Sequence, residues 1–137
     1  MKKIMLLLIV MMSSGAISLY SQTIIKTYKN VYGTWNRYKN KYDLQTTREA
    51  KINFSVYETY ISASDESNSI YRPLKKTNDG PTEDGRMLTY ECLDERNRVC
   101  HFTYMNYDNP DRSDTIMIIY DAFVYVYFIS EVIVDED

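Results

Sequence analysis

Residues 86–107 read RMLTYECLDERNRVCHFTYMNY, and this stretch decides the fold class. Apolar and polar residues alternate on both sides of Glu95-Arg96-Asn97, which is the period-two pattern of half-buried strands. We expect a β-hairpin with a three-residue loop, in which Asn97 takes the left-handed conformation that asparagine tolerates. The cross-strand partners, whose numbers add up to 192, are Leu88 with Tyr104, Tyr90 with Phe102, Cys92 with Cys100, Thr89 with Thr103, and Glu91 with His101. A one-residue slip would destroy this sorting of apolar and polar faces, so burial specifies the register.

A second hairpin is expected over 115–130, closed around Asp121-Ala122, with partner numbers that add up to 243. One face then carries Thr115, Met117, Ile119, Val124, Val126 and Phe128, and the other carries Ile116, Ile118, Tyr120, Phe123, Tyr125 and Tyr127. Because both faces are largely apolar, we expect these strands to be central and covered on both sides. Ala122 is a poor residue for a two-residue turn, which needs positive φ, so the turn itself does not support this register.

Shorter strand signals occupy the middle of the chain. Residues 51–56 alternate cleanly between polar and apolar residues. Residues 60–64 and 69–74 follow as further candidate strands on either side of the polar turn 65–68. Residues 77–85 contain Asn-Asp-Gly-Pro and Glu-Asp-Gly, so this segment is expected to be a loop.

Residues 23–42 can be interpreted in two ways. Ile25, Tyr28, Tyr32, Trp35 and Tyr42 recur at helical spacing, which suggests an amphipathic helix. Gly33 in the middle of the pattern and several β-branched residues argue against a helix. Tyrosine is also a good strand residue, and we favour two short strands broken near Val31–Gly33.

Together these elements predict an all-β protein, an antiparallel meander of seven to nine strands. A curled sheet or a small up-and-down barrel is its natural closure, because closure removes exposed strand edges. Residues 22–137 are expected to form a single β-rich domain with one modest core.

Residues 1–21 have the pattern of a secretory signal peptide. Lys2 and Lys3 precede nine unbroken apolar residues, 4–12, and small residues follow. A helix of nine residues rises only about 14 Å, against roughly 30 Å of hydrocarbon, so a membrane span is not expected. Cleavage could follow Ala16, Ser18 or Ser21, of which we take Ser21. The expected location is therefore outside the cytoplasm: periplasmic, cell-surface or secreted.

Composition and charge narrow the classes of function. The 137 residues carry a formal charge of −3, with 45% hydrophobic residues, two cysteines and one histidine. These values exclude a disordered chain, a disulfide scaffold and a four-cysteine zinc site. Seven basic and three acidic residues lie in 22–61, whereas four basic and fourteen acidic residues lie in 79–137. This asymmetry argues against nucleic-acid binding and leaves ordinary solvated faces or a basic partner open.

Gly33-Thr34-Trp35 is a Gly-x-Trp motif that precedes the strand meander. In this respect the chain resembles lipocalin-like (calycin-type) proteins, in which a tryptophan on the first strand closes one end of the barrel. The resemblance implies a ligand-holding barrel with Trp35 largely buried at one end. The chain also resembles small exported bacterial proteins of unknown function, which implies a compartment and no activity.

Cys92 and Cys100 occupy opposed positions of the first hairpin. In an exported protein such a pair is expected to form a disulfide. The predicted register places the pair at a hydrogen-bonded position, where a cross-strand disulfide is less comfortable. The alternative is two buried thiols that pack with Tyr90 and Phe102.

No catalytic or metal site is expected. His101 points to the face opposite Cys100 and is expected to pair with Glu91 across the strands. Two acidic clusters are expected to be solvated turns. Asp79, Glu83 and Asp84 match no EF-hand spacing, whereas Asp108, Asp111 and Asp114 recur at every third position around Pro110, so a calcium site is the less favoured alternative there. The sequence also has no phosphate loop, nucleophile elbow or Cys-x-x-Cys motif, so we expect no cofactor.

Fourteen tyrosines are the most unusual feature of the sequence. Tyrosine joins a large apolar ring to a polar tip, so it suits binding sites, although plain packing explains many such stripes. The residues expected to contact a ligand are Trp35, Tyr120, Phe123, Tyr125 and Tyr127. We expect a non-enzymatic binding protein for a small apolar or aromatic ligand. The alternatives are a protein-interaction module that exposes its tyrosine-rich face and, third, a hydrolase.

Overall fold

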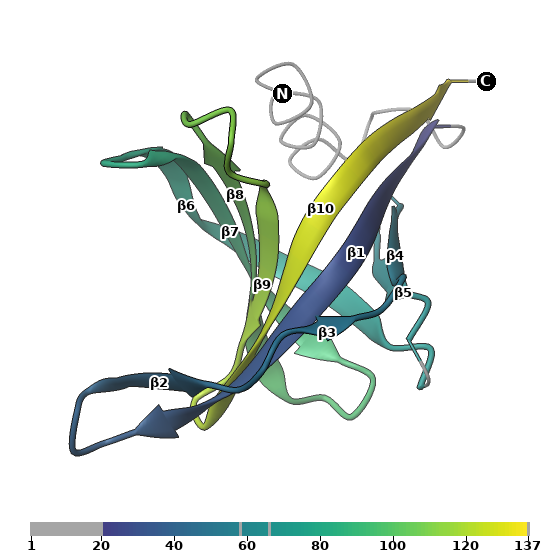
Figure 1. Cartoon of the computed structure of the whole chain (residues 1–137). Coiled ribbons are helices and arrows are strands. Elements are labelled where there is room, and N and C mark those ends of the chain that lie inside the picture. Colours follow the sequence, from purple (N-terminus) through teal and green to yellow (C-terminus); the bar gives the residue numbers. More distant parts are fainter. Residues whose placement is uncertain (1–20, 58, 66, 137) are drawn as a thin grey trace.

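The computed structural model describes residues 21–57, 59–65 and 67–136, and the regular structure in this part of the chain is entirely β (Figure 1). The predicted signal peptide lies outside these residues, apart from Ser21. The described strands are β1 (Ser21–Asn36), β2 (Lys41–Leu44), β3 (Arg48–Glu49), β4 (Asn53–Val56), β5 (Ile61–Ala63), β6 (Ile70–Thr82), β7 (Gly85–Asp94), β8 (Val99–Tyr107), β9 (Thr115–Ile119) and β10 (Phe123–Glu136).

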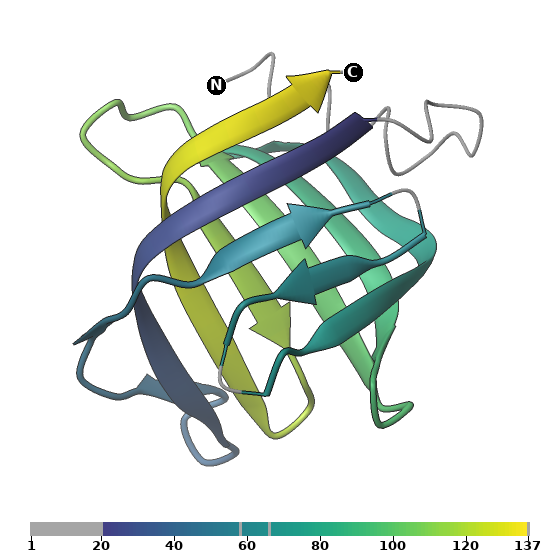
Figure 2. The same ribbon diagram turned by 90° about the vertical axis from the view of Figure 1, so that its right-hand side faces the viewer.

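Eight of these strands close into an antiparallel barrel. The order around the sheet is β10-β9-β8-β7-β6-β5-β4-β1, and β1 pairs again with β10. This closing seam runs from Ser21 opposite Glu136 to Thr34 opposite Phe123, and the two long strands lie side by side along it (Figure 2). The expected all-β antiparallel barrel is confirmed.

β2 and β3 are two additional short strands, and they pair with the same edge of β1 as β4 does. Gly33 pairs with Leu44, Lys29 with Glu49, and Ile25 with Phe54. The partner numbers add up to 77, 78 and 79, so each gap between these short strands inserts one residue. β2, β3 and β4 are therefore one interrupted strand with two bulges, which lets the sheet curl around β1.

Both predicted hairpin registers are confirmed. β7 and β8 pair with numbers that add up to 192, and β9 and β10 with numbers that add up to 243. Asn97 has φ 60°, as its place in the three-residue loop requires. In the second turn the Tyr120 N–H donates to the Phe123 carbonyl over 2.9 Å, and neither intervening residue has a positive φ.

Two local expectations are wrong. β1 is a continuous strand of sixteen residues, with no break near Val31–Gly33 and no helix. A Cβ on Gly33 would lie 2.7 Å from Leu44 Cδ2 and 3.2 Å from Val124 Cγ1, so this glycine permits close packing rather than a break. Residues 77–82 belong to β6, because pairing with β7 overrides their turn-forming composition, and the expected loop shrinks to Glu83-Asp84.

The barrel interior is packed over most of its length. Phe54 lies edge-on against Phe102 and Tyr127, with ring centroids 5.9 and 4.9 Å apart. At the end where β8 leads into β9, the buried Asp114 carboxylate accepts hydrogen bonds from Tyr104 Oη, Asn106 Nδ2 and Tyr107 N. Asp114 is therefore not the solvated turn residue that the sequence suggested.

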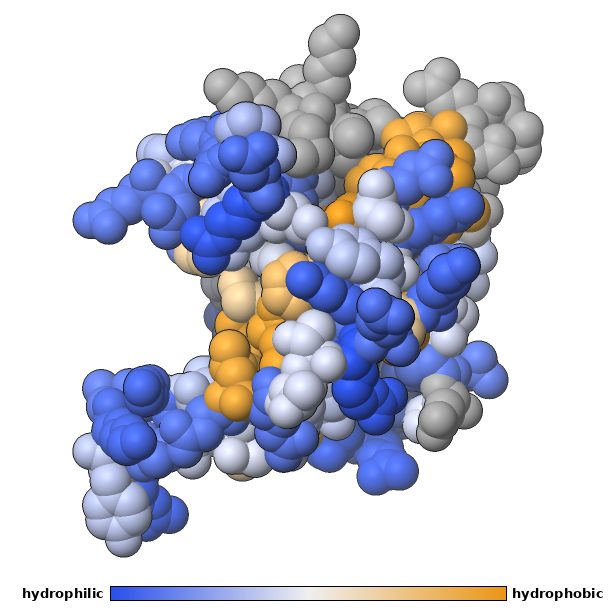
Figure 3. Space-filling model, viewed as in Figure 1, coloured by the Kyte–Doolittle hydropathy of each residue, from blue (hydrophilic) through white to orange (hydrophobic). Residues whose placement is uncertain are grey.

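The outer face of the last hairpin is apolar but only half covered. Val124 is buried there, whereas Met117, Ile119, Val126 and Phe128 are partly exposed. Apolar surface is visible over β9 and β10 between two hydrophilic projections (Figure 3). The expectation that both faces are fully covered is thus wrong for the outer face.

Candidate ligand-binding pocket

A pocket of about 610 Å³ lies at one end of the barrel. Its lining comes from the turns β5–β6, β7–β8 and β9–β10, from the segment between β2 and β4, and from inward positions of β1 and β10. In an up-and-down barrel these turns share one end, because the chain reverses direction at every strand. The opposite end holds the Asp114 hydrogen bonds.

One wall of the pocket is aromatic. Tyr32 of β1 lies 6.0 Å from Phe123 and 5.2 Å from Tyr125 of β10, measured between ring centroids. Phe123 stacks on Tyr120 at 4.5 Å, and Tyr125 stacks on Tyr127 at 6.4 Å. These rings line the pocket, so they offer stacking surface to a flat or apolar molecule.

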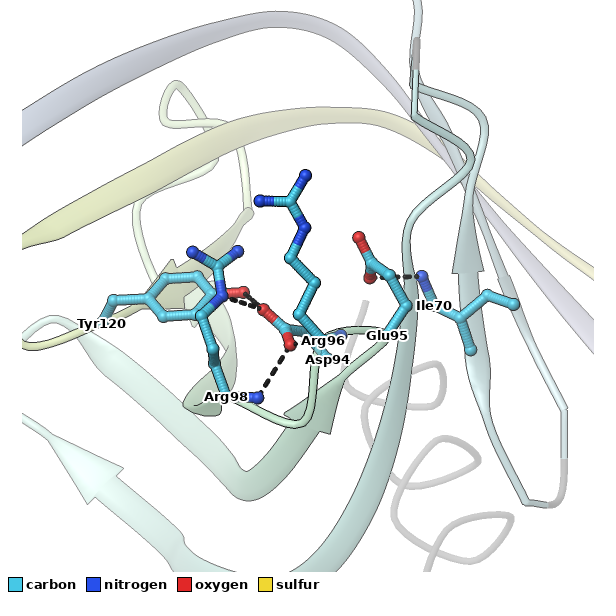
Figure 4. A network of polar contacts seen from close by, with 6 residues as sticks. All are labelled: Ile70, Asp94, Glu95, Arg96, Arg98 and Tyr120. Carbon is cyan, nitrogen blue, oxygen red and sulfur yellow. Dashed lines mark hydrogen bonds and ion pairs between the residues drawn. The ribbon is translucent and has the colours of Figure 1, made fainter.

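The floor is built on one buried carboxylate (Figure 4). Asp94, only 1% exposed, ends β7 and accepts a hydrogen bond from Tyr120 Oη over 2.8 Å. Its other oxygen accepts from the backbone N–H groups of Arg96 and Arg98, each at 2.9 Å. Arg98 Nε donates to the same oxygen as Tyr120, at 2.8 Å, and its guanidinium lies 5.1 Å from the Tyr120 ring centre.

These contacts fix the protonation states of the floor. Burial by itself would raise the pKa of Asp94, but the hydrogen bonds from Arg98, Tyr120 and Arg96 hold it below its usual value. Burial and donation to Asp94 raise the pKa of Tyr120. At neutral pH the floor therefore consists of an ionised carboxylate, a neutral phenol and a guanidinium.

Arginines and acids share the mouth of the pocket. Arg48 and Arg96 line it, and neither forms an ion pair or hydrogen bond through its side chain with another described residue. Asp65 accepts hydrogen bonds from the backbone N–H and the hydroxyl of Ser69. Glu95 accepts from the Ile70 N–H over 3.2 Å. The two acids are thus engaged by backbone and side-chain donors, whereas neither guanidinium group has a partner among the described residues.

The structure brings four of the five predicted contact residues together. Tyr120, Phe123, Tyr125 and Tyr127 all line the pocket. Trp35 does not: it lies where β1 runs past the barrel to pair with β2, it is 40% exposed, and its indole packs edge-on against Tyr42 at 5.0 Å. It therefore does not close the barrel, contrary to the expectation from the lipocalin-like motif.

Sequence reasoning missed the polar half of the site. Arg96 lies in the loop that the first hairpin register identified, and Asp94 and Arg98 flank this loop, but only the curvature of the barrel brings Tyr120 onto Asp94. The sequence did contain one indication of this site, the segment Asp-Glu-Arg-Asn-Arg at 94–98. Four of its five residues are charged, although a tight turn of this type requires no charged residues.

The expected disulfide is not formed. Cys92 and Cys100 face each other in the register, yet both are free thiols and fully buried. The pair sits two residues from the hydrogen bond between Asp94 N and Arg98 O, so it occupies a hydrogen-bonded position, which is unfavourable for a cross-strand bridge. Burial raises the pKa of Cys92 to about 12 and that of Cys100 to about 11.

His101 lies outside the pocket, on the outer face, opposite Glu91 and Ile119. Among the described residues no group of three or more His, Cys, Asp or Glu side chains is arranged to hold a metal ion.

No match was found among known proteins: no family model matches the sequence, and neither a curated protein nor a solved structure is significantly similar. The part of the chain that the structure describes contains no helix that is both long and apolar enough to cross a membrane.

Proposed function

We propose that this protein is an exported, non-enzymatic binding protein that holds a small apolar or aromatic molecule in a lipocalin-like barrel. The observation that carries the proposal is the pocket of about 610 Å³ with its aromatic wall. Pockets that bury a small organic ligand have this size and this mixture of aromatic rings and a few polar groups. Export is proposed from the pattern of residues 1–21.

The polar groups of the pocket support binding rather than catalysis. Asp94 has its carboxylate oxygens engaged by Tyr120, Arg96 and Arg98, and Asp65 is engaged by Ser69. Carboxylates held in this way position neighbouring groups and do not serve well as general bases.

The eight-stranded antiparallel barrel supports a lipocalin-like architecture. Membership of that family is part of the proposal, and the half-exposed Trp35 is the feature that departs from it. The pocket does not depend on Trp35, so binding and family membership are separate questions.

A neutral aromatic probe tests the proposal. We expect N-phenyl-1-naphthylamine to bind the purified protein saturably, with a rise in its fluorescence, because the probe leaves water for the aromatic wall. Tyr125→Ala removes one ring of that wall and is expected to weaken binding by about tenfold. Tyr38→Ala is the matched control, because Tyr38 is 95% exposed and lies outside the pocket. Absence of saturable binding to the unmodified protein would refute the proposal.

A second candidate is a protein-interaction module. The predicted tyrosine face lines the pocket, so this candidate depends on another surface, the hairpin between β1 and β2 that extends away from the barrel (Figure 1). Its tip carries the exposed Tyr38 between Arg37 and Lys39, and the half-exposed Trp35 lies at its base. A partner captured from the source organism by the unmodified protein but not by Tyr38→Ala would favour this candidate.

A further inference from the structure

We propose that the ligand of this pocket is a monocarboxylate, with its anionic group held by Arg98 and Arg96 and its apolar body against the wall formed by Tyr32, Phe123 and Tyr125. This inference rests on the proposed binding function and names the class of ligand. It follows from how the two guanidinium groups are held.

Arg98 is fixed but not saturated. Its Nε donates to Asp94, and the plane of its guanidinium is supported by the Tyr120 ring. No hydrogen bond joins either terminal nitrogen to another described residue, and both point away from Asp94 (Figure 4). An arginine anchored through Nε can therefore donate from its two terminal nitrogens at once, and this bidentate geometry matches the two oxygens of a carboxylate. Because the side chain is already ordered, binding costs little further rotamer entropy.

Arg96 supplies a second cation on the same side. Its backbone N–H is bound to Asp94, but its side chain rises from the turn toward the space that the Arg98 terminal nitrogens face (Figure 4). Both arginines line the pocket, and the Arg96 side chain forms no ion pair within the described part of the chain. An anion placed between them would contact two guanidinium groups that come from one turn.

The charge of the site disfavours a dianion. Three arginines (Arg48, Arg96 and Arg98) and two acids (Asp65 and Glu95) line the pocket, and the ionised Asp94 is paired with Arg98, so these six side chains carry no net formal charge. A monocarboxylate places one negative charge at Arg96 and Arg98, whereas a phosphate dianion would add a second charge near Asp65, Glu95 and Asp94. The aromatic wall in turn favours an acid with an apolar or aromatic body over a small polar acid.

Calorimetric titration with two probes that share one ring system tests the inference: 2-naphthoate and the neutral 2-naphthalenemethanol. We expect the unmodified protein to bind 2-naphthoate at least tenfold more tightly than the alcohol, the usual effect of a hydrogen bond to a charged group. Arg96→Gln should remove most of this preference and leave the affinity for the alcohol unchanged. Arg112→Gln, which removes the same charge in the β8–β9 connection at the other end of the barrel, should keep the preference.

The outcomes separate the two proposals. Equal affinity for acid and alcohol, or equal behaviour of Arg96→Gln and Arg112→Gln, would overturn the carboxylate assignment while leaving the binding function in place. Failure of both naphthalene probes and of N-phenyl-1-naphthylamine to bind would overturn the binding function, and the carboxylate assignment with it. Because the Arg96 side chain is exposed and forms no hydrogen bond or ion pair with another described residue, we expect its substitution to leave the barrel folded.

Discussion

Asp94 is the residue on which the floor of the pocket depends. It is buried, and its carboxylate receives hydrogen bonds from Tyr120, Arg98 and Arg96, which come from the β7–β8 and β9–β10 turns. A buried charge is tolerated only when such partners replace its hydration. Removing the charge should therefore affect stability and the position of Arg98 together.

Asp94→Asn is expected to reduce the free energy of unfolding by about 2–4 kcal/mol at pH 7, because charge-assisted hydrogen bonds are lost. The pKa of Asp94 is lowered in the folded state, so its contribution is complete above the unfolded value of about 3.9 and is lost as the pH falls through the folded value. Urea unfolding at pH 7, 5 and 3 should thus show a stability difference between the variant and the unmodified protein that is similar at pH 7 and 5 and smaller at pH 3. Asp111→Asn, at an exposed position, should change stability little at every pH. A constant difference from pH 7 to pH 3 would contradict this account.

Cys92 and Cys100 are expected to be free thiols that do not react with alkylating reagents while the protein is folded. Their raised pKa values, about 12 and about 11, and their complete burial leave almost no reactive thiolate at pH 8. Iodoacetamide should therefore modify neither cysteine in the native protein and both in urea, as read by intact mass. Protein purified without reductant that gains no alkyl group in urea would instead contain the disulfide.

At the scale of elements, the β7–β8 hairpin was fully predictable from the sequence. Its strands alternate strictly, and only one register sorts them, so local information is sufficient. Asn97 added an independent signal for the loop. Both faces of the last hairpin are apolar, so burial alone did not specify its register, but its aromatic residues recur at every second position of β10 and this side supplies the pocket wall.

β6 and the polar floor were not predictable from the sequence, because both depend on contacts between distant segments. β6 shifts register between Pro73 and Lys75 and between Lys76 and Asn78, and such bulges erase the period-two pattern. The bond from Tyr120 to Asp94 joins residues 26 positions apart across three strands, and no local pattern encodes it.

Gly85, which begins β7, is expected to be essential to the β6–β7 hairpin. Its φ of 157° and a distance of only 1.9 Å from a hypothetical Cβ to the Asn106 carbonyl oxygen leave no room for a side chain. Gly85→Ala should destabilise the protein by about 3 kcal/mol or more, since the obstructing atoms belong to the backbone. Gly80→Ala on β6 is the matched control, because nothing lies within 4 Å of its hypothetical Cβ. Similar melting temperatures for the two variants would contradict this expectation.

For the whole molecule, the closing seam determines which parts of the chain must be continuous. Ser21 pairs with Glu136, so a linker of a few residues can join these positions without strain. A circular permutant opened between Glu83 and Asp84, both exposed, should keep the β-sheet circular dichroism spectrum and bind the neutral probe. The matched permutant opened between Phe102 and Thr103, inside buried β8, should not fold. Equal folding of the two permutants would mean that the barrel does not require an intact β8.

The same seam has a consequence for the order of events during synthesis. β1 is made first, yet its longest partner, β10, is made last, so the barrel cannot close until residues 123–136 have left the ribosome. Until then one edge of β1 has no strand to pair with, and such an unpaired edge can form hydrogen bonds with other chains and promote aggregation. The barrel therefore stays open until β10 has been made. This delay would suit a chain that crosses a narrow translocation channel in the unfolded state, as the export proposed above would require.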